Sequence, residues 1–327
     1  RSRELSGEAE DGVGVPKRLV VMAHFDPDGL VAPHVRRQIE AWLQLSVRLI
    51  VVSTAALVDE ARDWLATHAE LIQRANYGYD FLSYKEGLAT GGDLAAYDEV
   101  VICNDTYVGP LRPYAAILGD MAEREVDFWG MARCNRRKPH IQSYFAVFRP
   151  QVVASAAFRE FWDAVQPLAS RGAVIRRYEV GMSVRLRKAG FRFGSYFRED
   201  KRERRLGRLR VIWWVLRRQP SKRSGGRLQR LWEDAHEPWN PAAAVADSAL
   251  AEAKFPLVKI DTLRHDPYGL DADRLLALCE QAYPAEFAGV SDYLERTASS
   301  YPTRKGEGLR PTPWWLKPFG PLVAYRR

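Results

Sequence analysis

The sequence lacks the long apolar segments and closely spaced cysteines that mark membrane-spanning and disulfide-rich secreted proteins. No apolar run approaches the roughly 18–20 residues that a membrane-spanning helix needs. Residues 1–16 are polar, without an apolar signal-peptide segment, and are expected to form a flexible tail. The three cysteines, Cys103, Cys134 and Cys279, are far apart in the chain. These absences predict a protein of a reducing, cytoplasmic compartment.

Several common catalytic motifs are also missing. The chain contains no G-x-G-x-x-G, G-x-x-x-x-G-K-[ST], H-E-x-x-H or G-x-S-x-G. The usual support for dinucleotide-binding, P-loop, zinc-protease and serine-hydrolase functions is therefore absent. The six histidines and three cysteines show no metal-ligand spacing, so no zinc site is expected.

The positive charge is confined to one segment. The 327 residues carry 49 Lys and Arg against 41 Asp and Glu, a net charge of +8. Residues 201–230 hold twelve Lys or Arg and one acid, Glu203, which gives this segment +11 and leaves −3 on the rest of the chain. Such a local patch, without a nucleic-acid-binding signature, does not favour a nucleic-acid partner.

Apolar, β-rich runs alternate with helical patterns in the first half of the chain. Strands are expected at 18–23, 47–53, from 71, and at 99–103, and helices at 35–45, 56–68 and 82–89. Further strands are expected at 127–131, 143–148 and 191–197, and helices at 158–165 and 180–189. This alternation predicts an α/β fold with a mainly parallel sheet that helices cover on both faces. We expect this domain over residues 17–200, a basic segment over 201–230 and a mostly helical region over 231–327.

Polar clusters follow three of the predicted strands, at residues 24–29, 74–80 and 104–106. One such cluster is typical of a turn or a helix cap. Three at one edge favour a site, because ligands of open α/β sheets bind beyond the carboxyl ends of the strands. A sugar nucleotide suits them: a carboxylate can accept hydrogen bonds from ribose hydroxyls, and Asp105 could hold Mg²⁺ or Mn²⁺ beside a diphosphate.

At these residues the sequence resembles the rhamnan synthesis protein F family, glycosyltransferase-like proteins of bacterial surface polysaccharide assembly. The matching stretches span about residues 18–268 and are residues 23–26, 74–85, 103–110, 127–130, 142–145, 178–181 and 255–259. The resemblance implies a GT-A-like nucleotide-sugar-binding fold. It also implies transfer of a deoxyhexose, typically L-rhamnose from dTDP-rhamnose, to a lipid-linked glycan at the inner face of the cytoplasmic membrane.

The chain departs from the GT-A pattern at one position. GT-A enzymes commonly carry Asp-x-Asp, whereas this chain has Asn104-Asp105-Thr106. One carboxylate stands where two are usual, so the resemblance leaves dependence on Mg²⁺ or Mn²⁺ open.

Roles for individual residues follow from the resemblance and from position. The candidate donor-binding residues are His24, Asp26, Asn76, Gly78, Tyr79, Asp80, Lys85, Asn104, Asp105 and Lys259. The candidate acceptor-binding residues are Trp129, Gly130, His140, Gln142, Ser143 and Tyr144. Purely structural roles compete with each assignment: capped turns for residues 76–80, a surface lysine for Lys85, and a core position for Trp129.

Transfer to a sugar hydroxyl with inversion needs one carboxylate as general base. Glu179 is the first candidate, because it is expected to open a helix after a β-rich run. The competing interpretation is a carboxylate that only complements the helix dipole. Asp127, at the start of a strand, is the second candidate.

The pattern of the basic segment predicts an amphipathic helix. Leu206, Leu209, Trp213 and Leu216 fall on one helical face, flanked by arginines. A cationic helix with two tryptophans suits an anionic membrane surface, where a lipid-linked acceptor would be presented. The alternatives are a helix that packs on the domain with its arginines in water, and a contact between copies of the chain in an oligomer.

The sequence thus predicts an inverting glycosyltransferase. Two alternatives remain open at this point: a transferase that uses a GDP-linked deoxysugar such as fucose, and a non-catalytic glycan- or membrane-binding protein that retains the fold.

Overall fold

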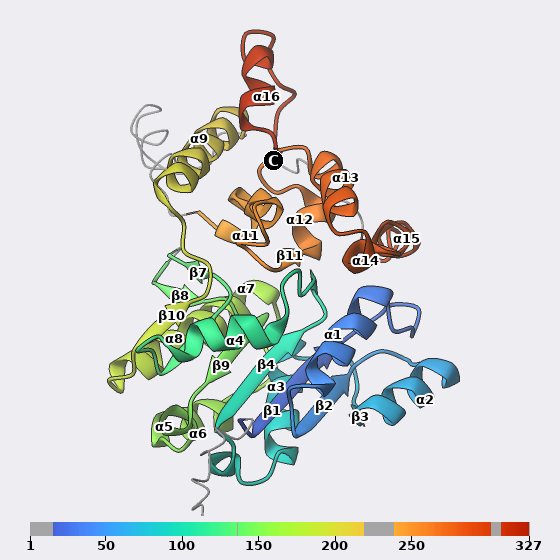
Figure 1. Ribbon diagram of the computed structural model, residues 1–327, viewed down its shortest axis with the longest axis vertical. Coiled ribbons are helices and arrows are strands. Elements are labelled where there is room, and N and C mark those ends of the chain that lie inside the picture. Colours follow the sequence, from blue (N-terminus) through green and yellow to red (C-terminus); the bar gives the residue numbers. More distant parts are fainter. Residues whose placement is uncertain (1–15, 136, 219–238, 302–308, 327) are drawn as a thin grey trace, which may run out of the picture.

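A computed structural model of the chain describes residues 16–135, 137–218, 239–301 and 309–326 (Figure 1). Its centre is a seven-stranded sheet with the order β10-β6-β9-β4-β1-β2-β3. The strands are β1 (Arg18–His24), β2 (Arg48–Ser53), β3 (Glu70–Gln73), β4 (Glu99–Asn104), β6 (Phe128–Gly130), β9 (Phe145–Phe148) and β10 (Phe193–Ser195). Only β9 runs antiparallel to its neighbours within this sheet, which confirms the mainly parallel sheet.

Helices cover both faces of the sheet, as the continuous apolar strands predict. Along β1, Val20 and Met22 pack into one apolar cluster, whereas Leu19 and Val21 pack into the other. The first cluster contains residues of α1 (Pro33–Leu43), α2 (Asp59–His68) and α4 (Tyr114–Ala122). The second contains residues of α3 (Tyr79–Thr90), α5 (Pro150–Val153), α6 (Ala156–Asp163) and α8 (Val180–Lys188).

The structure corrects the predicted start of the helix at Glu179. The helical run begins at α7 (Arg171–Val174), continues through a π-helical turn (Ile175–Glu179) and leads directly into α8. Glu179 therefore lies inside a continuous helical run and does not open a helix. The prediction missed the first turns, although Val174, Tyr178 and Met182 are spaced four residues apart and share a buried face. π-helical turns within helices occur frequently at functional sites.

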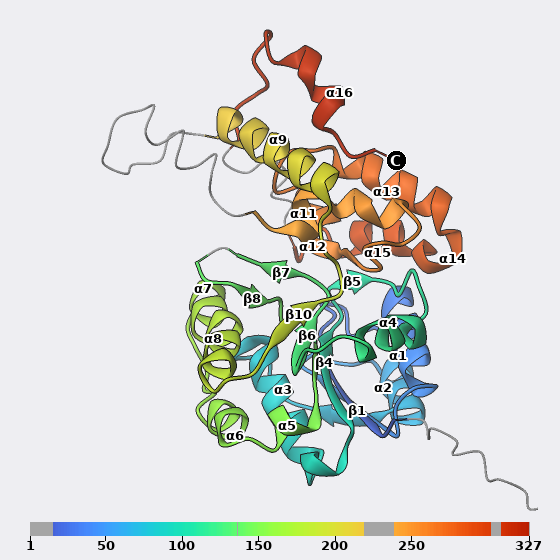
Figure 2. The same ribbon diagram turned by 60° about the vertical axis from the view of Figure 1, so that its left-hand side comes forward.

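Two small sheets lie beside the main one. β7 (Arg133–Cys134) pairs with β8 (His140–Ile141), and β5 (Tyr107–Val108) pairs antiparallel with β11 (Val258–Lys259). The second pairing joins the segment that follows β4 to the C-terminal region, whose helices lie above β5 in Figure 2. It places Lys259 opposite Tyr107. A residue far along the sequence is thereby brought to the edge of the sheet where β4 ends.

The C-terminal region is mostly helical, as expected, and has an apolar cluster of its own. Its helices are α9 (Lys201–Arg217), α11 (Pro241–Ala244), α12 (Ile260–His265), α13 (Ala272–Ala282), α14 (Pro284–Phe287), α15 (Val290–Arg296) and α16 (Gly320–Val323). Short 3₁₀ turns occupy Leu94–Ala96, Ala246–Leu250 and Lys317–Phe319. Among the described residues, no helix is long and apolar enough to cross a membrane.

The predicted basic helix is present as α9, but only part of its apolar face is buried. Asp200 caps the first turn of α9 with a capping box that involves Glu203. Trp213 is buried in the C-terminal core, whereas Leu209 and Leu216 are 54% and 43% exposed. Arg210 is fully buried and pairs with Asp247 at 2.6 Å. Residues 219–230 of the predicted segment lie outside the described residues.

Candidate active site

The carboxyl ends of β1 and β4 bring three of the predicted polar clusters to one edge of the sheet. The two strands are parallel neighbours, with Ala23 opposite Asn104. The Asn104 side-chain amide donates a hydrogen bond to the Asp80 carboxylate at 2.7 Å, which connects the end of β4 to the first turn of α3. Burial raises the pKa of Asp80, although Asn104 and the charges of Lys259 and Arg171 lower it.

Asp105 lies at the centre of this edge. One of its carboxylate oxygens accepts a hydrogen bond from the backbone N–H of Phe25 at 2.6 Å. Burial raises the pKa of Asp105 to about 8, and the negative charges of Asp80 and Asp26 add to this rise, whereas backbone hydrogen bonds oppose it. At neutral pH this carboxyl is therefore largely protonated.

Two buried histidines adjoin Asp105. His24 contacts the Ser53 hydroxyl through Nδ1 at 3.0 Å, and Nε2 of His34 lies 3.2 Å from the backbone carbonyl oxygen of Asp105. Burial lowers the pKa of each imidazole to about 4, so both rings are neutral at pH 7. Nε2 of His24 and Nδ1 of His34 are buried without a hydrogen-bond partner in the described part of the chain.

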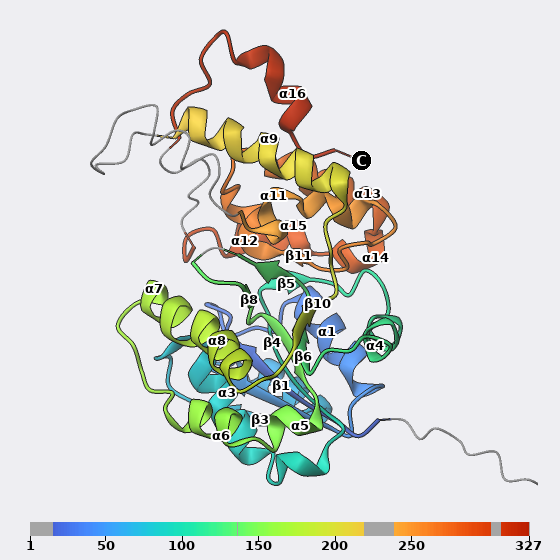
Figure 3. The ribbon, with the colours of Figure 1, turned by 90° about the vertical axis from the view of Figure 1, so that its left-hand side faces the viewer.

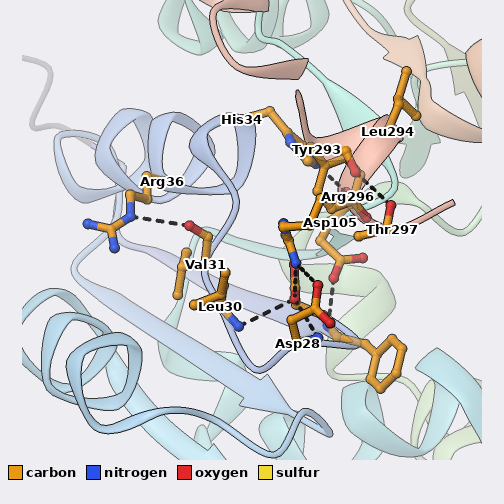
Figure 4. Close-up of polar contacts among 12 residues, drawn as sticks. Asp28, Leu30, Val31, His34, Arg36, Asp105, Tyr293, Leu294, Arg296 and Thr297 are labelled. Carbon is orange, nitrogen blue, oxygen red and sulfur yellow. Dashed lines mark hydrogen bonds and ion pairs between the residues drawn. The ribbon is translucent and has the colours of Figure 1, made fainter. Parts of the chain in front are cut away.

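Helix α15 reaches this edge through Arg296, which lies beside Asp28 in Figure 4. The guanidinium donates hydrogen bonds to both oxygens of Asp26, at 2.7 and 3.1 Å, and also pairs with Asp28. Burial raises the pKa of Asp26, but Arg296 and the backbone N–H of Asp28 outweigh that effect and hold it below its usual range. The C-terminal region thus contacts the strand ends directly.

A second cluster surrounds Glu179. One carboxylate oxygen accepts hydrogen bonds from the Ser143 N–H at 2.9 Å and the Ser143 hydroxyl at 2.7 Å. The other oxygen lies 3.6 Å from Nε2 of His140. Burial raises the pKa of Glu179, but His140 and Ser143 together hold it below its usual range. Glu179 is therefore an ionised, oriented carboxylate at neutral pH.

Lys259 lies between the two clusters. Its ammonium sits 4.3 Å from the centre of the Tyr144 ring, and within the described ranges it forms no hydrogen bond or ion pair. Burial lowers the pKa of Lys259, although the charges of Asp261 and Glu179 raise it. Arg171 is near enough to Asp80 and Glu179 to feel both charges, and it pairs with Asp261 at 2.6 Å.

The donor set does not fit a divalent metal held by the protein. Mg²⁺ and Mn²⁺ require several oxygen ligands. Within the residues that the structure describes, no three His, Cys, Asp or Glu side chains gather where they could hold an ion. One oxygen of Asp105 is taken by Phe25, and Asp80 is held by Asn104. A divalent ion bound at this edge would need oxygens of the diphosphate and water to complete its ligand set.

The structure places Asp127, the second candidate base, away from Glu179, the first. It lies at the amino end of the short strand β6, at the edge of the sheet opposite the site. Its two oxygens accept hydrogen bonds from the backbone N–H of Arg192 at 2.6 Å and the side chain of Gln151 at 2.9 Å. Asp127 therefore joins the start of β6 to the segment that precedes β10.

Three further predicted site residues serve the fold. Trp129 and Gly130 are fully buried within β6, so neither offers a surface to an acceptor. The Lys85 ammonium donates hydrogen bonds to the carbonyls of Asp163 and Val165, at 2.8 and 2.9 Å. It thus satisfies backbone acceptors at the end of α6, and it is not available for a diphosphate.

The turn before α3 has a structural requirement for glycine. Gly78 adopts φ of +77°, and a Cβ there would lie 2.0 Å from Leu82. The predicted close approach is therefore made by a side chain of α3.

Asn76 and Tyr79 are exposed, so their donor-binding roles remain predictions. Gln142 and Tyr144, by contrast, are buried beside the second cluster, each with a polar atom that has no hydrogen-bond partner among the described residues.

Sequence reasoning missed Arg171 and Arg296. Arg171 lies in helical turns that the prediction missed, and Arg296 lies beyond the region of family resemblance. Its contact with Asp26 joins residues 270 positions apart. No local sequence pattern indicates a role at the site for either residue.

Comparison with known proteins identifies the family. The model of the family "Rhamnan synthesis protein F" matches residues 49–211, which include Asp80, Asp105 and Glu179. An uncharacterised protein of Sinorhizobium fredii, y4gN, is 25% identical over 185 residues, which are 55% of this chain and 48% of the relative. Virulence protein VirA of Vibrio anguillarum is 29% identical over 116 residues, which are 34% of this chain and 36% of VirA. The chain thus spans about half or less of these curated relatives.

Two solved structures match part of the chain with low identity. Glucosyl-3-phosphoglycerate synthase of Mycobacterium tuberculosis has 14% identity and a TM-score of 0.36, and the likeness covers 52% of this chain and 80% of that one. A putative nucleotide-diphospho-sugar transferase of Desulfovibrio desulfuricans has 15% identity and a TM-score of 0.36, over 54% and 78% of the two chains. Because the family match covers the sheet from β2 to β10 together with the polar clusters at residues 80, 105 and 179, the chain belongs to the rhamnan synthesis protein F family.

Proposed function

We propose that the chain is an inverting glycosyltransferase that moves a deoxyhexose, L-rhamnose from dTDP-rhamnose, to a lipid-linked bacterial surface glycan. Family membership supports the class of reaction. The observation that carries the proposal is the pairing of an oriented carboxylate, Glu179, with a cation, Lys259, that lacks a hydrogen-bonded partner in the described residues. A group transfer from a diphosphate needs both: a base for the acceptor and positive charge for the leaving group.

The donor occupies the edge where β1 and β4 end. Carboxylates at Asp26 and Asp80 are suited to accept hydrogen bonds from ribose and sugar hydroxyls. The diphosphate lies against Lys259 and Arg171, the two cations nearest Asp80 and Glu179. Positive side chains stabilise the charge that develops on the diphosphate as the glycosidic bond breaks.

Glu179 acts as the base. The acceptor hydroxyl oxygen attacks the anomeric carbon and passes its proton to the Glu179 oxygen that faces His140, while the nucleoside diphosphate departs with the bonding electron pair. The two hydrogen bonds from Ser143 fix the carboxylate, so little reorganisation is needed during the reaction. The acceptor is held near His140, Gln142 and Ser143, and the Gln142 side-chain oxygen is available for one of its hydroxyls.

A donor screen tests this proposal. The chain is incubated with dTDP-rhamnose, dTDP, GDP-fucose and GDP, and its melting temperature is measured. Ligands that bind the folded state raise it. A rise with dTDP-rhamnose above that with the GDP compounds supports the proposed donor, and the reverse order assigns a GDP-linked deoxysugar. If no nucleotide changes the melting temperature, the enzyme proposal fails in favour of a non-catalytic glycan- or membrane-binding protein.

A further inference from the structure

The last described segment, residues 309–326, exposes large apolar side chains. Trp314 is 82% exposed, Trp315 50%, Phe319 51% and Leu322 58%. Leu316 and Val323 of the same segment are buried and attach it to the C-terminal core. Exposed apolar side chains are ordinary when scattered, but such a concentration marks an interaction site.

Helix α9 adds a second exposed apolar row. Leu209, Ile212 and Leu216 are 54%, 37% and 43% exposed. They lie three and four residues apart and therefore share one side of the helix. The opposite side of α9 packs into the C-terminal core through Val211 and Val215. Its outer side thus carries apolar residues that the described part of the fold leaves uncovered.

The two rows adjoin one another. The buried Arg210 of α9 donates a hydrogen bond to the Val323 carbonyl at 2.7 Å, and a Cβ placed on Gly320 would lie 3.7 Å from Trp213. Figures 1 and 3 both show α9 and α16 side by side at the end of the molecule away from the main sheet. We call the exposed residues Leu209, Ile212, Leu216, Trp314, Trp315, Phe319 and Leu322 the apical face.

Positive charge surrounds the apical face. Segments 201–218 and 309–326 together contain eleven Lys or Arg residues and one acid, Glu203. Glu203 is already engaged, by Lys254 and Ser248. Of the cations, Arg210 is internal, whereas Arg202, Arg205, Arg310 and Lys317 are exposed. Apolar and aromatic residues interspersed with cations complement an anionic lipid surface.

The exposed tryptophans are not the two of the predicted basic helix. Trp213 is 6% exposed and donates a hydrogen bond to the Gly269 carbonyl at 3.2 Å. Trp214 is half-buried against Tyr268. Neither can enter a membrane without unpacking the C-terminal core, whereas Trp314 and Trp315 are already exposed.

We propose that the apical face binds an anionic lipid bilayer. Trp314, Trp315 and Phe319 insert at the level of the headgroups, and the cations of α9 contact the anionic headgroups. A second copy of the chain is the competing occupant, and charge favours the bilayer because two such cationic faces repel each other. The apical face is independent of the proposed transfer reaction, so either proposal can fail alone.

Vesicle binding tests this inference. The chain is mixed with vesicles of phosphatidylcholine that contain phosphatidylglycerol, or with phosphatidylcholine alone, and the bound fraction is measured by sedimentation. We expect binding to the anionic vesicles that weakens with salt. The double variant Trp314→Ser/Trp315→Ser should bind about tenfold more weakly or worse, because two large apolar groups no longer insert.

Matched variants separate insertion from general surface effects. Leu43→Ser/Val47→Ser changes two exposed apolar residues near the opposite end of the sheet and should leave binding unchanged. Trp314→Phe/Trp315→Phe should retain most of the affinity but lose quenching of tryptophan fluorescence by brominated lipids.

Two results would overturn the inference. One is equal binding of the wild type and the Trp314→Ser/Trp315→Ser variant to anionic vesicles, or no binding of either. The other is a concentration-dependent dimer in analytical ultracentrifugation that this variant abolishes while the vesicles bind nothing, which would assign the apical face to a second copy of the chain.

Discussion

Ser143 holds Glu179 by two hydrogen bonds to the same carboxylate oxygen, at 2.9 Å from its N–H and 2.7 Å from its hydroxyl. Both come from one residue of the segment between β8 and β9, and they leave the other oxygen of Glu179 facing His140. The carboxylate is thereby kept ionised and oriented although it is largely buried.

The Ser143→Ala variant tests this relationship. It removes one hydrogen bond that stabilises the charged carboxylate, so the pKa of Glu179 should rise. In a pH profile of kcat/KM, the acidic limb should move to higher pH, because the base is protonated over a wider range. An acidic limb that stays at the wild-type pH in Ser143→Ala would show that Glu179 is not the group that titrates.

Lys259 is expected to contribute to affinity for the diphosphate. Lys259→Met should weaken binding of dTDP by about tenfold or more, because the variant loses a charge-assisted contact. Isothermal titration calorimetry measures the change. Lys85→Met provides the matched control, since that ammonium is engaged by the carbonyls of Asp163 and Val165. Equal losses in the two variants would remove Lys259 from the donor site.

Removal of metal should not change donor binding. The described residues do not gather a set of ligands for a divalent ion, and the proposed site neutralises the diphosphate with Lys259 and Arg171. The dissociation constant of dTDP should therefore be the same in EDTA as in MnCl₂ within about twofold, which is about 0.4 kcal/mol. Loss of binding in EDTA, restored by Mn²⁺, would establish a metal site centred on Asp105 and the donor.

Arg296 should couple stability to pH through Asp26. The ion pair holds the folded-state pKa of Asp26 below its usual value. Its contribution is therefore present above the unfolded-state pKa and is lost as pH falls through the folded-state pKa. In chemical denaturation, Arg296→Gln should be less stable than wild type at pH 7, and the difference should shrink in acid. Arg62→Gln, which breaks an exposed pair with Asp59, serves as the control.

The sheet and the position of the site could be predicted from the sequence because both depend on local patterns. The apolar runs of β1, β2 and β4 are buried on both faces, and this alone specifies parallel strands between helices. Since parallel strands end at one edge, Asp26 and Asp105 could be placed together before the structure was known.

Other predictions failed for identifiable physical reasons. Lys85 follows Asp80 by five residues, which at about 100° per residue turns it to a different side of α3, toward α6. Trp129 is predicted to contact the acceptor because aromatic rings stack on the apolar faces of sugars. It lies instead in β6, between β10 and β9, and is buried there. Arg296 could not be found at all, because its partner is 270 residues away.

The most direct test of the account is the Glu179→Gln variant in a transfer assay with dTDP-rhamnose and a lipid-linked glycan acceptor. We expect the variant to bind dTDP like the wild type and to lose transfer by about 10²–10⁴-fold, because a neutral amide keeps the shape of the side chain but cannot accept the proton. Asp127→Asn should retain transfer. Transfer by Glu179→Gln at the wild-type rate would contradict the central claim that Glu179 is the base.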